Sequence, residues 1–416
     1  MLQYIFFTTI DQFNDKFYIE INFILKHQKN FLLRMKTVAI IGYAHEKYGL
    51  LSDNTEDLIR KMVKGAIENV DKGINPREID WIITSCVDNQ FSEQHQTGTV
   101  AWEALGNPMA KAFRVEAACC SGSLAVYLAR NLIRSGLARN VLVVGFEKMS
   151  AVSTLVATGI LMRGSSPEER RVGITQPASY SIMIQQYMKK YGATEEDFAM
   201  VSVKNHENAM RNPWAHFRKK ITVEDVLNSR LIAPPIRLLH CCPISDGAAA
   251  VILSGEPKKY TDAPVYIAGM GMAHDAFSSF RREDPAFLLA SKLAADEAYK
   301  EAGITPADIR IAEVHDAFTP VEPMCYEALG IAKRGEGYKL IREGVVMFDG
   351  AIPVNVSGGL KAKGHPVGAT GVGMLIEIYL QLRGEADQRQ VPNVEVGVVE
   401  NHGGTGSVSI VTVLRR

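Results

Sequence analysis

The stretch GINPREIDWIITS, residues 73–85, has a near copy further along the chain, GITPADIRIAEVH at residues 303–315. In each copy a glycine able to end a helix precedes a proline suited to the first position of a new helical turn. A run rich in apolar residues follows, with the length and β-branched content of a buried strand. Two copies of such a formula in one chain indicate a duplicated α/β unit.

The segments that precede these two copies also match each other. The apolar stretches VAIIGYAH (38–45) and VYIAGMGMAH (265–274) both read as buried strands that contain glycine. Each leads into a segment with helical periodicity, EDLIRKMVKGAIENV (56–70) in the first copy and FLLASKLAADEAYKEA (287–302) in the second. The order of a strand, a helix and the glycine-proline formula is therefore the same in both halves.

The match continues downstream. CCSGSLAVYLARNLIRSG (119–136) and GATGVGMLIEIYLQLRG (368–384) are small-residue turns that open amphipathic helices ending at glycine. NVLVVGFEKMS (140–150) and NVEVGVVENHGG (393–404) follow them as β-rich runs that reach a glutamate at the same place. Four matching pairs in the same order predict an internal duplication, with two mixed sheets packed through shared helices.

The pattern divides the chain into four parts. Residues 1–34 are predicted to be an extension, with Met35 opening the compact fold. Residues 35–150 with 241–260 form the first half, and residues 261–416 form the second. Periodicity weakens in the insertion at 151–240, which is expected to be a loop-rich subdomain. Its basic residues allow two interpretations, a solvated surface or a lid over an anionic ligand, and both stay open.

Composition excludes several classes of function. The 416 residues carry 46 Lys and Arg against 46 Asp and Glu, so no excess of positive charge points to a nucleic acid. No stretch has the ~18–20 consecutive apolar residues of a membrane span. The six cysteines show neither CxxC nor Cys/His ligand spacing, so no metal site or disulfide framework is predicted. Free thiols are typical of a reducing cytoplasm.

Cys119 and Cys120 stand side by side where a strand is predicted to end and a helix to begin. Unpaired N–H groups at a helix N-terminus stabilise a thiolate, so the pKa of a cysteine there is expected to fall. The alternative is that both cysteines simply fill a crowded turn. In the second copy, His365 precedes the matching helix. An approximate two-fold axis would bring this imidazole to the thiol, as in an activated nucleophile.

Five motifs carry a family resemblance that covers about Met35 to Arg416. They are CxSG at 119–122, GFEKMS at 145–150, DGAAAVIL at 246–253, HDAF at 315–318 and GGLKAKGHPVGATG at 358–371. Together they resemble the thiolases. HDxF in place of NEAF is similar to the branch that contains sterol-carrier-protein-type and archaeal thiolases. The resemblance implies a thiolase fold, an α/β architecture with the two duplicated halves in a layered α-β-α-β-α arrangement.

The resemblance also implies roles for individual residues. Thiolases cleave a 3-oxoacyl-CoA, or run the reverse condensation, through an acyl-cysteine. The motif C-x-S-G selects Cys119 as the nucleophile and leaves Cys120 on the variable position. His365 would activate Cys119, and His315 would contribute to a first oxyanion hole. The backbone N–H groups of Cys119 and Gly403 would form a second one.

One feature departs from the family pattern. Thiolases use a second acid/base, usually a cysteine, either at the x of HDxF or in a C-terminal CxG loop. Here these places hold Ala317 and the segment Asn401-His402. Three hypotheses stay open: His402 serves as the acid/base, substrate groups or water do so, or the chemistry has changed. Cys325 is interpreted as a core residue.

The resemblance further implies coenzyme A as co-substrate and a homodimer. The basic residues Arg218, Lys219 and Lys220 of the insertion are candidates for binding the coenzyme. A small zinc-ribbon/OB-fold partner is implied by the branch, and any zinc would have to belong to that partner. Neither a nucleic acid nor a membrane is an expected partner.

The sequence allows three functions. The first is acyl-CoA C-acyltransferase activity (EC 2.3.1), CoA-dependent thiolysis of a bulky 3-oxoacyl-CoA. The similarity to benzoylsuccinyl-CoA thiolase subunits suggests aromatic degradation, with benzoyl-CoA and succinyl-CoA as products. The second is a thiolase-like aldolase or a condensing synthase, although such aldolases lack the cysteine that "CCSG" retains. The third is a non-catalytic scaffold subunit.

Overall fold

The computed structural model describes residues 37–416. The predicted extension and its boundary at Met35 lie outside the described residues. Within the described part, no helix is both long enough and apolar enough to cross a membrane.

Nine of the described strands belong to one hydrogen-bonded sheet, in the order β3-β2-β4-β7-β1-β8-β11-β10-β9. The remaining two form a short ribbon, β5-β6. The strands are β1 (Ala39–His45), β2 (Trp81–Ser85), β3 (Lys111–Val115), β4 (Asn140–Lys148), β5 (Leu231–Ala233), β6 (Ile236–Arg237), β7 (Asp246–Ser254), β8 (Val265–His274), β9 (Ile311–Val314), β10 (Val396–Gly403) and β11 (Val408–Arg415).

The sheet consists of the two predicted halves. β3-β2-β4-β7-β1 come from the first half, and β8-β11-β10-β9 repeat this order in reverse. Val354 forms a parallel β-bridge with Ala312 of β9. In the first half, β3 pairs with β2 in parallel at the corresponding place. The halves join through a short antiparallel pairing in which Ala39 and Ile40 of β1 face Tyr266 and Val265 of β8. The two expected mixed sheets are thus present, and this pairing connects them.

Thirteen α-helices lie within the described residues. They are α2 (Thr55–Glu68), α3 (Asn89–Ser92), α4 (Thr97–Leu105), α5 (Ser121–Arg134), α6 (Thr154–Leu161), α7 (Pro167–Arg171), α8 (Gln176–Tyr191), α9 (Glu195–Ala209), α10 (Val223–Asn228), α11 (Leu289–Ala302), α12 (Glu322–Ala328), α13 (Gly337–Arg342) and α14 (Val367–Arg383).

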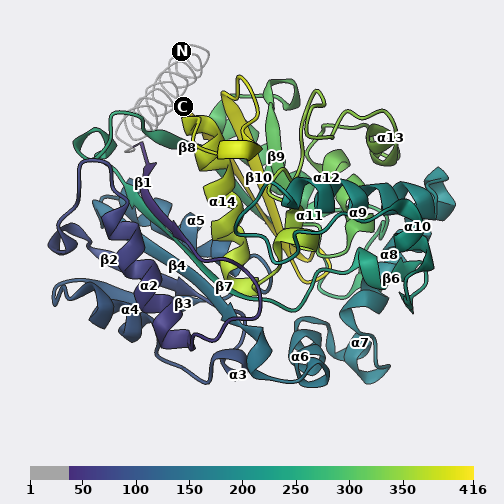
Figure 1. Cartoon of the computed structure of the whole chain (residues 1–416), viewed down its shortest axis with the longest axis horizontal. Coiled ribbons are helices and arrows are strands. Elements are labelled where there is room, and N and C mark those ends of the chain that lie inside the picture. Colours follow the sequence, from purple (N-terminus) through teal and green to yellow (C-terminus); the bar gives the residue numbers. More distant parts are fainter. Residues whose placement is uncertain (1–36) are drawn as a thin grey trace, which may run out of the picture.

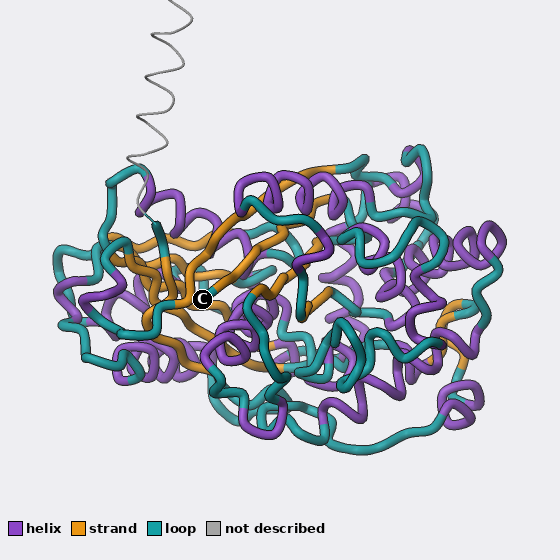
Figure 2. Tube along the Cα trace, turned by 90° about the horizontal axis from the view of Figure 1, so that it is seen from above, coloured by secondary structure: helices purple, strands orange, loops and turns teal. Residues whose placement is uncertain are grey.

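The helices complete five layers. α2 and α4 cover the outer face of the first half, and α11 covers the second. α5 and α14 lie between the halves, and α14 contacts strands of both. Figure 1 shows α14 near the centre, with β2 and β4 on one side and β9 and β10 on the other, and Figure 2 shows helices surrounding the strands. This confirms the α-β-α-β-α thiolase fold.

The glycine-proline formula forms the same local structure twice. Pro76 and Pro306 each begin a single 3₁₀ turn. Each turn has a capping box, Asn75 with Glu78 in the first copy and Thr305 with Asp308 in the second. The side chain and the backbone of these caps satisfy N–H groups that the turn leaves free. The chain then enters β2 or β9.

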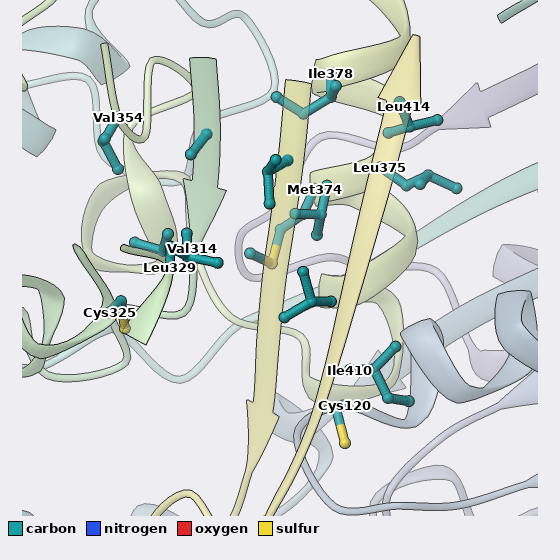
Figure 3. Packing of buried hydrophobic residues seen from close by; sticks show 14 of the residues in the cluster. Cys120, Val314, Cys325, Leu329, Val354, Met374, Leu375, Ile378, Ile410 and Leu414 are labelled. Atoms are coloured by element: carbon teal, nitrogen blue, oxygen red, sulfur yellow. The ribbon is translucent and has the colours of Figure 1, made fainter. Parts of the chain in front are cut away.

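The core lies between the two central helices and the sheet. All sixteen residues from Val367 to Leu382 of α14 are buried, as expected of a helix covered on every side. Figure 3 shows Met374, Leu375 and Ile378 of α14 packed beside Ile410 and Leu414 of β11. Burial on both faces likewise explains why β4 and β7 read as continuous apolar runs.

The insertion at 151–240 is mostly helical, with α6 to α10 and the β5-β6 ribbon. The expected loop-rich character therefore does not describe it. α9 shows why sequence periodicity was weak there, because it buries polar residues as well as apolar ones. Lys204 hydrogen-bonds the carbonyl of Val354, and Asn205 hydrogen-bonds the carboxylate of Asp316. Buried polar networks of this kind remove the contrast on which a helical pattern depends.

Candidate active site

Cys119 lies in a tight turn between β3 and α5. Ala118, just before it, has a positive φ of 49°, a conformation that costs energy for a residue with a side chain. The Ser121 hydroxyl donates to the carbonyl of Ala118 at 2.6 Å and accepts from the N–H of Ala117 at 2.9 Å. These bonds hold the strained turn, and the Cys119 side chain lines a cavity.

The two neighbouring cysteines point to different environments. Cys120 is fully buried, and its thiol donates to the carbonyl of Ala117 at 3.0 Å. Figure 3 shows its sulfur next to Ile410 in the core. Of the doublet, only Cys119 lines the cavity.

Small residues bring the two helix N-termini together. A Cβ on Gly368, at the start of α14, would lie 2.4 Å from the carbonyl oxygen of Phe146, and one on Gly122 of α5 would lie 2.9 Å from that of Gly368. The buried carboxylate of Glu147 accepts the N–H groups of Val87 at 2.8 Å and Gly368 at 2.9 Å. The glycines permit the approach and Glu147 ties α14 to the first half.

His365 stands just before α14 and lines the same cavity. Thr370 donates its hydroxyl proton to the carbonyl of Pro366 at 3.0 Å. Its oxygen therefore accepts from Nδ1–H of His365 at 2.7 Å. Nε2 therefore carries a lone pair and no proton. It has no hydrogen-bond partner among residues 37–416, and His365 as a whole is 5% exposed. The geometry suits a general base.

His315 has the opposite tautomer. The Asn401 amide accepts the Ser123 hydroxyl at 2.9 Å through Oδ1, and its Nδ2 donates to the carbonyl of Cys119 at 3.3 Å. The same Nδ2 lies 2.9 Å from Nδ1 of His315 and donates to it. The proton of the neutral His315 ring is consequently on Nε2, which has no partner in the described part of the chain. His315 thus presents a hydrogen-bond donor.

The thiol and the two imidazoles form one cluster. The sulfur of Cys119 and one ring nitrogen each of His315 and His365 all lie within 4.8 Å of one another. Burial lowers the pKa of His365 to about 3, and the charge of His402 adds to this effect. Burial also lowers the pKa of His315 well below its ordinary value, with smaller contributions from His402 and His365. Both rings are therefore neutral at pH 7.

The expected lowering of the pKa of Cys119 is corrected by the structure. Burial raises the pKa of its thiol to about 11, and the Glu116 and Glu147 carboxylates raise it further. The backbone N–H groups of Gly404 and Cys119 act in the opposite direction but do not outweigh burial. In the free protein Cys119 is thus a neutral thiol that needs a base.

In the loop after β10, Gly404 lines the cavity and Gly403 does not. Gly403 pairs with Val408 at the end of β10, where a Cβ would lie 2.7 Å from the carbonyl oxygen of Ala117. A hydrogen bond from the backbone N–H of Gly404 lowers the pKa of Cys119, against the effect of burial. Gly404 is thus a second candidate, beside the predicted Gly403, for the loop donor of the second oxyanion hole.

His402 is buried behind the cavity wall. Its Nδ1 lies 3.0 Å from the Glu400 carboxylate, and its Nε2 lies 3.0 Å from the Tyr180 hydroxyl. Tyr180 donates its own proton to the carbonyl of Gly404 at 2.6 Å, so both ring nitrogens of His402 act as donors. Tyr180 lines the cavity and His402 does not. Since both ring nitrogens of His402 are engaged, the predicted acid/base would first have to break one of these hydrogen bonds.

The cavity has a volume of about 260 Å³ and is largely apolar. The insertion supplies one wall, with residues from α6, the following turn and α8. The cavity-lining residues are Val87, Asp88, Glu116, Ala118, Cys119, Met149, Ile160, Leu161, Arg163, Gly164, Gln176, Tyr180, Cys242, Pro243, Ile244, Ala317, Phe318, His365, Val367 and Gly404. The lid interpretation of the insertion is consistent with this wall.

The cations that were predicted to bind coenzyme A do not line the cavity. Arg218, Lys219 and Lys220 are exposed on the loop between α9 and α10, and none of them lines the cavity. Lys220 pairs with Glu207 at 2.9 Å, and Arg218 donates to the carbonyl of Met210. Arg163, at the cavity, lies 3.5 Å from Asp88.

Two groups of potential metal donors occur in residues 37–416. Each has its donor atoms within 4.8 Å of one another, and they are Cys119 with His315 and His365, and Cys325 with Glu400 and His402. Nε2 of His315 carries its proton, and Glu400 and His402 already bond each other. Cys325 is fully buried, as interpreted from the sequence.

Residues 39–257 match the family description "Thiolase, N-terminal domain", and residues 271–416 match "Thiolase C-terminal domain-like". The chain belongs to the thiolase family. These bounds agree with the sheet topology, in which β7 completes the first half. Thiolases are acyltransferases that use coenzyme A as a substrate, and this thiolase is an enzyme of that class.

Curated thiolases similar to this one include an acetyl-CoA acetyltransferase of Methanothermobacter thermautotrophicus, 41% identical over 92% of this chain and 100% of that protein. The benzoylsuccinyl-CoA thiolase subunit BbsB of Thauera aromatica is 36% identical over 67% of this chain and 73% of its own length. Among solved structures, the Ltp2-ChsH2(DUF35) aldolase has a TM-score of 0.77 at 26% identity, over 91% of this thiolase and 97% of that chain.

Sequence reasoning named Cys119, His365 and His315, and the fold brings these three together. Arg163 was among the basic residues of the insertion for which a lid over an anionic ligand was considered, but Tyr180 and Cys242 were not identified as cavity residues. A single tyrosine in a helix of mixed composition and one cysteine of a doublet give no local signal. Their position depends on contacts between segments far apart in the chain.

Proposed function

We propose that this protein catalyses the CoA-dependent thiolysis of a 3-oxoacyl-CoA through an acyl-Cys119 intermediate, or the reverse condensation. The observation that carries the proposal is the cluster of Cys119, His365 and His315, of which the first two line the cavity. A neutral thiol, an imidazole with a bare Nε2 and an imidazole with a protonated Nε2 lie within 4.8 Å of one another. A nucleophile, its base and an oxyanion donor are the groups that acyl transfer needs.

In the first half-reaction, Nε2 of His365 takes the proton of Cys119. The sulfur attacks the 3-keto carbon, and the oxyanion that forms meets the N–H groups of Cys119 and Gly404. When this tetrahedral adduct collapses, the C2–C3 bond breaks and its electron pair remains on C2 as the enolate of an acyl-CoA. The Nε2–H of His315 donates to the enolate oxygen. C2 then takes up one proton, and the acyl group remains on Cys119.

In the second half-reaction, the sulfur of coenzyme A attacks the acyl carbon after losing its own proton. The S–C bond to Cys119 breaks, and the departing thiolate recovers its proton from His365. The products are two acyl-CoA molecules. Loss of one oxyanion-hole donor in such reactions costs about 10²–10³ in rate.

The cavity supports a bulky, apolar acyl group. Met149, Ile160 and Phe318 contribute to its wall, and its volume of about 260 Å³ exceeds what an acetyl group fills. We therefore propose an aromatic or otherwise large 3-oxoacyl-CoA, with benzoylsuccinyl-CoA as the first candidate because of the similarity to BbsB. Arg163 at the cavity would pair with a substrate carboxylate, and Arg218, Lys219 and Lys220 are proposed to bind the coenzyme's phosphates.

The similarity to a thiolase-like aldolase suggests a second candidate function. Aldol cleavage leaves no acyl group on the protein and needs no sulfur nucleophile. The hydrogen-bonded turn before α5 places Cys119 at the cavity, and this arrangement favours thiolysis. A scaffold without activity would not need the complementary tautomers of His315 and His365.

We also propose two partners. The first is a second copy of this chain, because β3 is an edge strand of the sheet with one side free within the described residues. The second is a small zinc-ribbon/OB-fold protein, since the solved aldolase includes a DUF35 component.

The test combines labelling and turnover. Iodoacetamide should modify Cys119 in preference to Cys120, and an acyl-CoA should protect it. A panel of 3-oxoacyl-CoA esters with free coenzyme A, offered with and without the product of a neighbouring gene, should yield paired acyl-CoA products. Cys119→Ala should abolish them, whereas Cys120→Ala should not. Products that persist in Cys119→Ala would exclude an acyl-cysteine mechanism.

A further inference from the structure

The proposed reaction leaves one proton without a carrier. When C2–C3 breaks, C2 must be protonated, and in the reverse direction it must lose a proton. His365 already holds the proton of Cys119, and the Nε2–H of His315 faces the enolate oxygen. A third group at the cavity is needed, and its identification rests on the proposed function.

Most candidates at the cavity are engaged elsewhere. Asp88 accepts the N–H of Gln90 at 2.8 Å and pairs with Arg163. Glu116 accepts the N–H of Ala118 at 2.5 Å. Tyr180 donates its only proton to the carbonyl of Gly404. Each of these groups would have to break a hydrogen bond or an ion pair before it could exchange a proton with the substrate.

Cys242 is differently placed. It lies in the loop before β7 and lines the cavity together with Cys119. Its N–H donates to the carbonyl of Ala317 at 2.9 Å, and Cys241 next to it bridges Phe318. This pairing holds Cys242 beside the segment that follows His315. Ala317 contributes only a methyl group there.

The Cys242 thiol is available for proton transfer. Within the described residues, no hydrogen bond involves its sulfur, whereas the sulfurs of Cys120, Cys241 and Cys325 each have a carbonyl partner. Burial raises the pKa of the Cys242 thiol, with a further contribution from Cys241, so the group is protonated at pH 7. Lys361, which donates to the carbonyl of Cys241 at 2.8 Å, would stabilise the thiolate after transfer.

We propose that Cys242 is the acid/base that exchanges a proton with C2 of the substrate. Cys242 comes from a different segment than Ala317 but lies at the same wall of the cavity. In cleavage, the S–H bond of Cys242 breaks, its proton forms the new C2–H bond, and a thiolate remains. The thiol of the incoming coenzyme A then returns a proton to Cys242 as its sulfur attacks acyl-Cys119. The balance closes without another reactant.

The test separates acyl transfer from proton transfer at C2. Wild type and variants are incubated with acetyl-CoA in D₂O. Acetylation of Cys119 is measured as an endpoint by mass spectrometry of the intact protein, and deuterium in the acetyl methyl group is measured over time. Cys242→Ala should still acetylate Cys119 but incorporate deuterium at least about 10²-fold more slowly, the usual contribution of a general acid/base. Cys242→Ser should behave similarly, because an alcohol is a much weaker acid.

Cys241→Ala is the matched control, since this neighbouring cysteine does not line the cavity, and it should exchange deuterium like wild type. Cys242→Ala that exchanges at the wild-type rate overturns the inference while leaving the proposed function intact. Loss of exchange in Tyr180→Phe together with normal exchange in Cys242→Ala overturns it in favour of the tyrosine. Where acetyl-CoA does not acetylate wild-type Cys119, the same measurements are made with the acyl-CoA products of the turnover panel. A wild-type protein whose Cys119 is acylated by none of them contradicts the proposed function itself.

Discussion

Asn401 donates a hydrogen bond to Nδ1 of His315 at 2.9 Å across 86 residues of sequence. Ser123 and the carbonyl of Cys119 hold the amide in the orientation that makes this donation possible. One amide thus connects the nucleophile's turn to the imidazole and decides which nitrogen of His315 carries the proton. The position of the proton on His315, whose ring belongs to the cluster around the Cys119 sulfur, depends on this amide.

Asn401→Asp should reverse this tautomer. A carboxylate accepts rather than donates, so the proton of His315 would move to Nδ1 and a lone pair would face the developing oxyanion. We expect kcat to fall by about 10²–10³-fold with a smaller change in KM. Steady-state kinetics with a 3-oxoacyl-CoA that the turnover panel shows to be a substrate measure this, and ¹⁵N NMR of the imidazole reports the tautomer.

Ser123→Ala is the graded comparison for that substitution. Without the hydroxyl, the amide can turn but is not forced to, so a smaller loss in kcat is expected. Equal kcat values in wild type and Asn401→Asp would contradict a role for the tautomer.

The alkylation rate of Cys119 should depend on pH in a specific way. The raised pKa of about 11 means that little thiolate exists at pH 7, and only the thiolate reacts readily with iodoacetamide. Between pH 7 and pH 10 the rate should climb by nearly tenfold for each pH unit. Mass spectrometry of the labelled protein measures it. A rate that is constant from pH 6 upward would instead indicate a thiolate–imidazolium pair.

Glu147 should make stability depend on pH. Burial raises its pKa to about 8 from an ordinary value of 4.5, so the folded state binds a proton that the unfolded state has released. Its contribution is present in full below pH 4.5 and is lost as pH rises through 8. Each unit of difference corresponds to about 1.4 kcal/mol.

Glu147→Gln should therefore reduce the decline in the free energy of unfolding between pH 5 and pH 8. The amide oxygen can still accept the N–H groups of Val87 and Gly368, so the fold is retained. Urea unfolding at several pH values measures the slope. Asp316 and Glu313, with pKa values raised by burial to about 7, will leave some slope in the variant. An unchanged slope would show that Glu147 is ionised throughout.

Gly368→Ala should impair stability and activity together. A Cβ at this position would lie 2.4 Å from the Phe146 carbonyl and 2.5 Å from the Cα of Cys86, so α14 would have to move and His365 with it. Overpacking of this kind typically costs 1–3 kcal/mol. Thermal unfolding and turnover measure both effects. In contrast, Gly159→Ala in α6 meets no atom within 4 Å and should slightly stabilise the protein.

Some of the site could be predicted from local pattern. The duplicated glycine-proline formula around Pro76 and Pro306 predicted two homologous halves. The turn before each central helix indicated that Cys119 and His365 would lie close together. The helical structure of the insertion was harder to predict, because α9 buries Lys204 and Asn205 and therefore lacks an apolar stripe. Charge alone pointed to Arg218, Lys219 and Lys220, whereas the arginine at the cavity is Arg163.

The sequence by itself determined the duplication, the order of the elements and the nucleophile, because helical and strand periodicity, caps and turn residues act over a few neighbouring positions. Only the tertiary structure decided the tautomer of His315, the raised pKa of Cys119 and the position of Cys242 beside Ala317. These properties arise from burial and from hydrogen bonds between segments many residues apart. Such contacts exist only once the two halves have packed around α5 and α14.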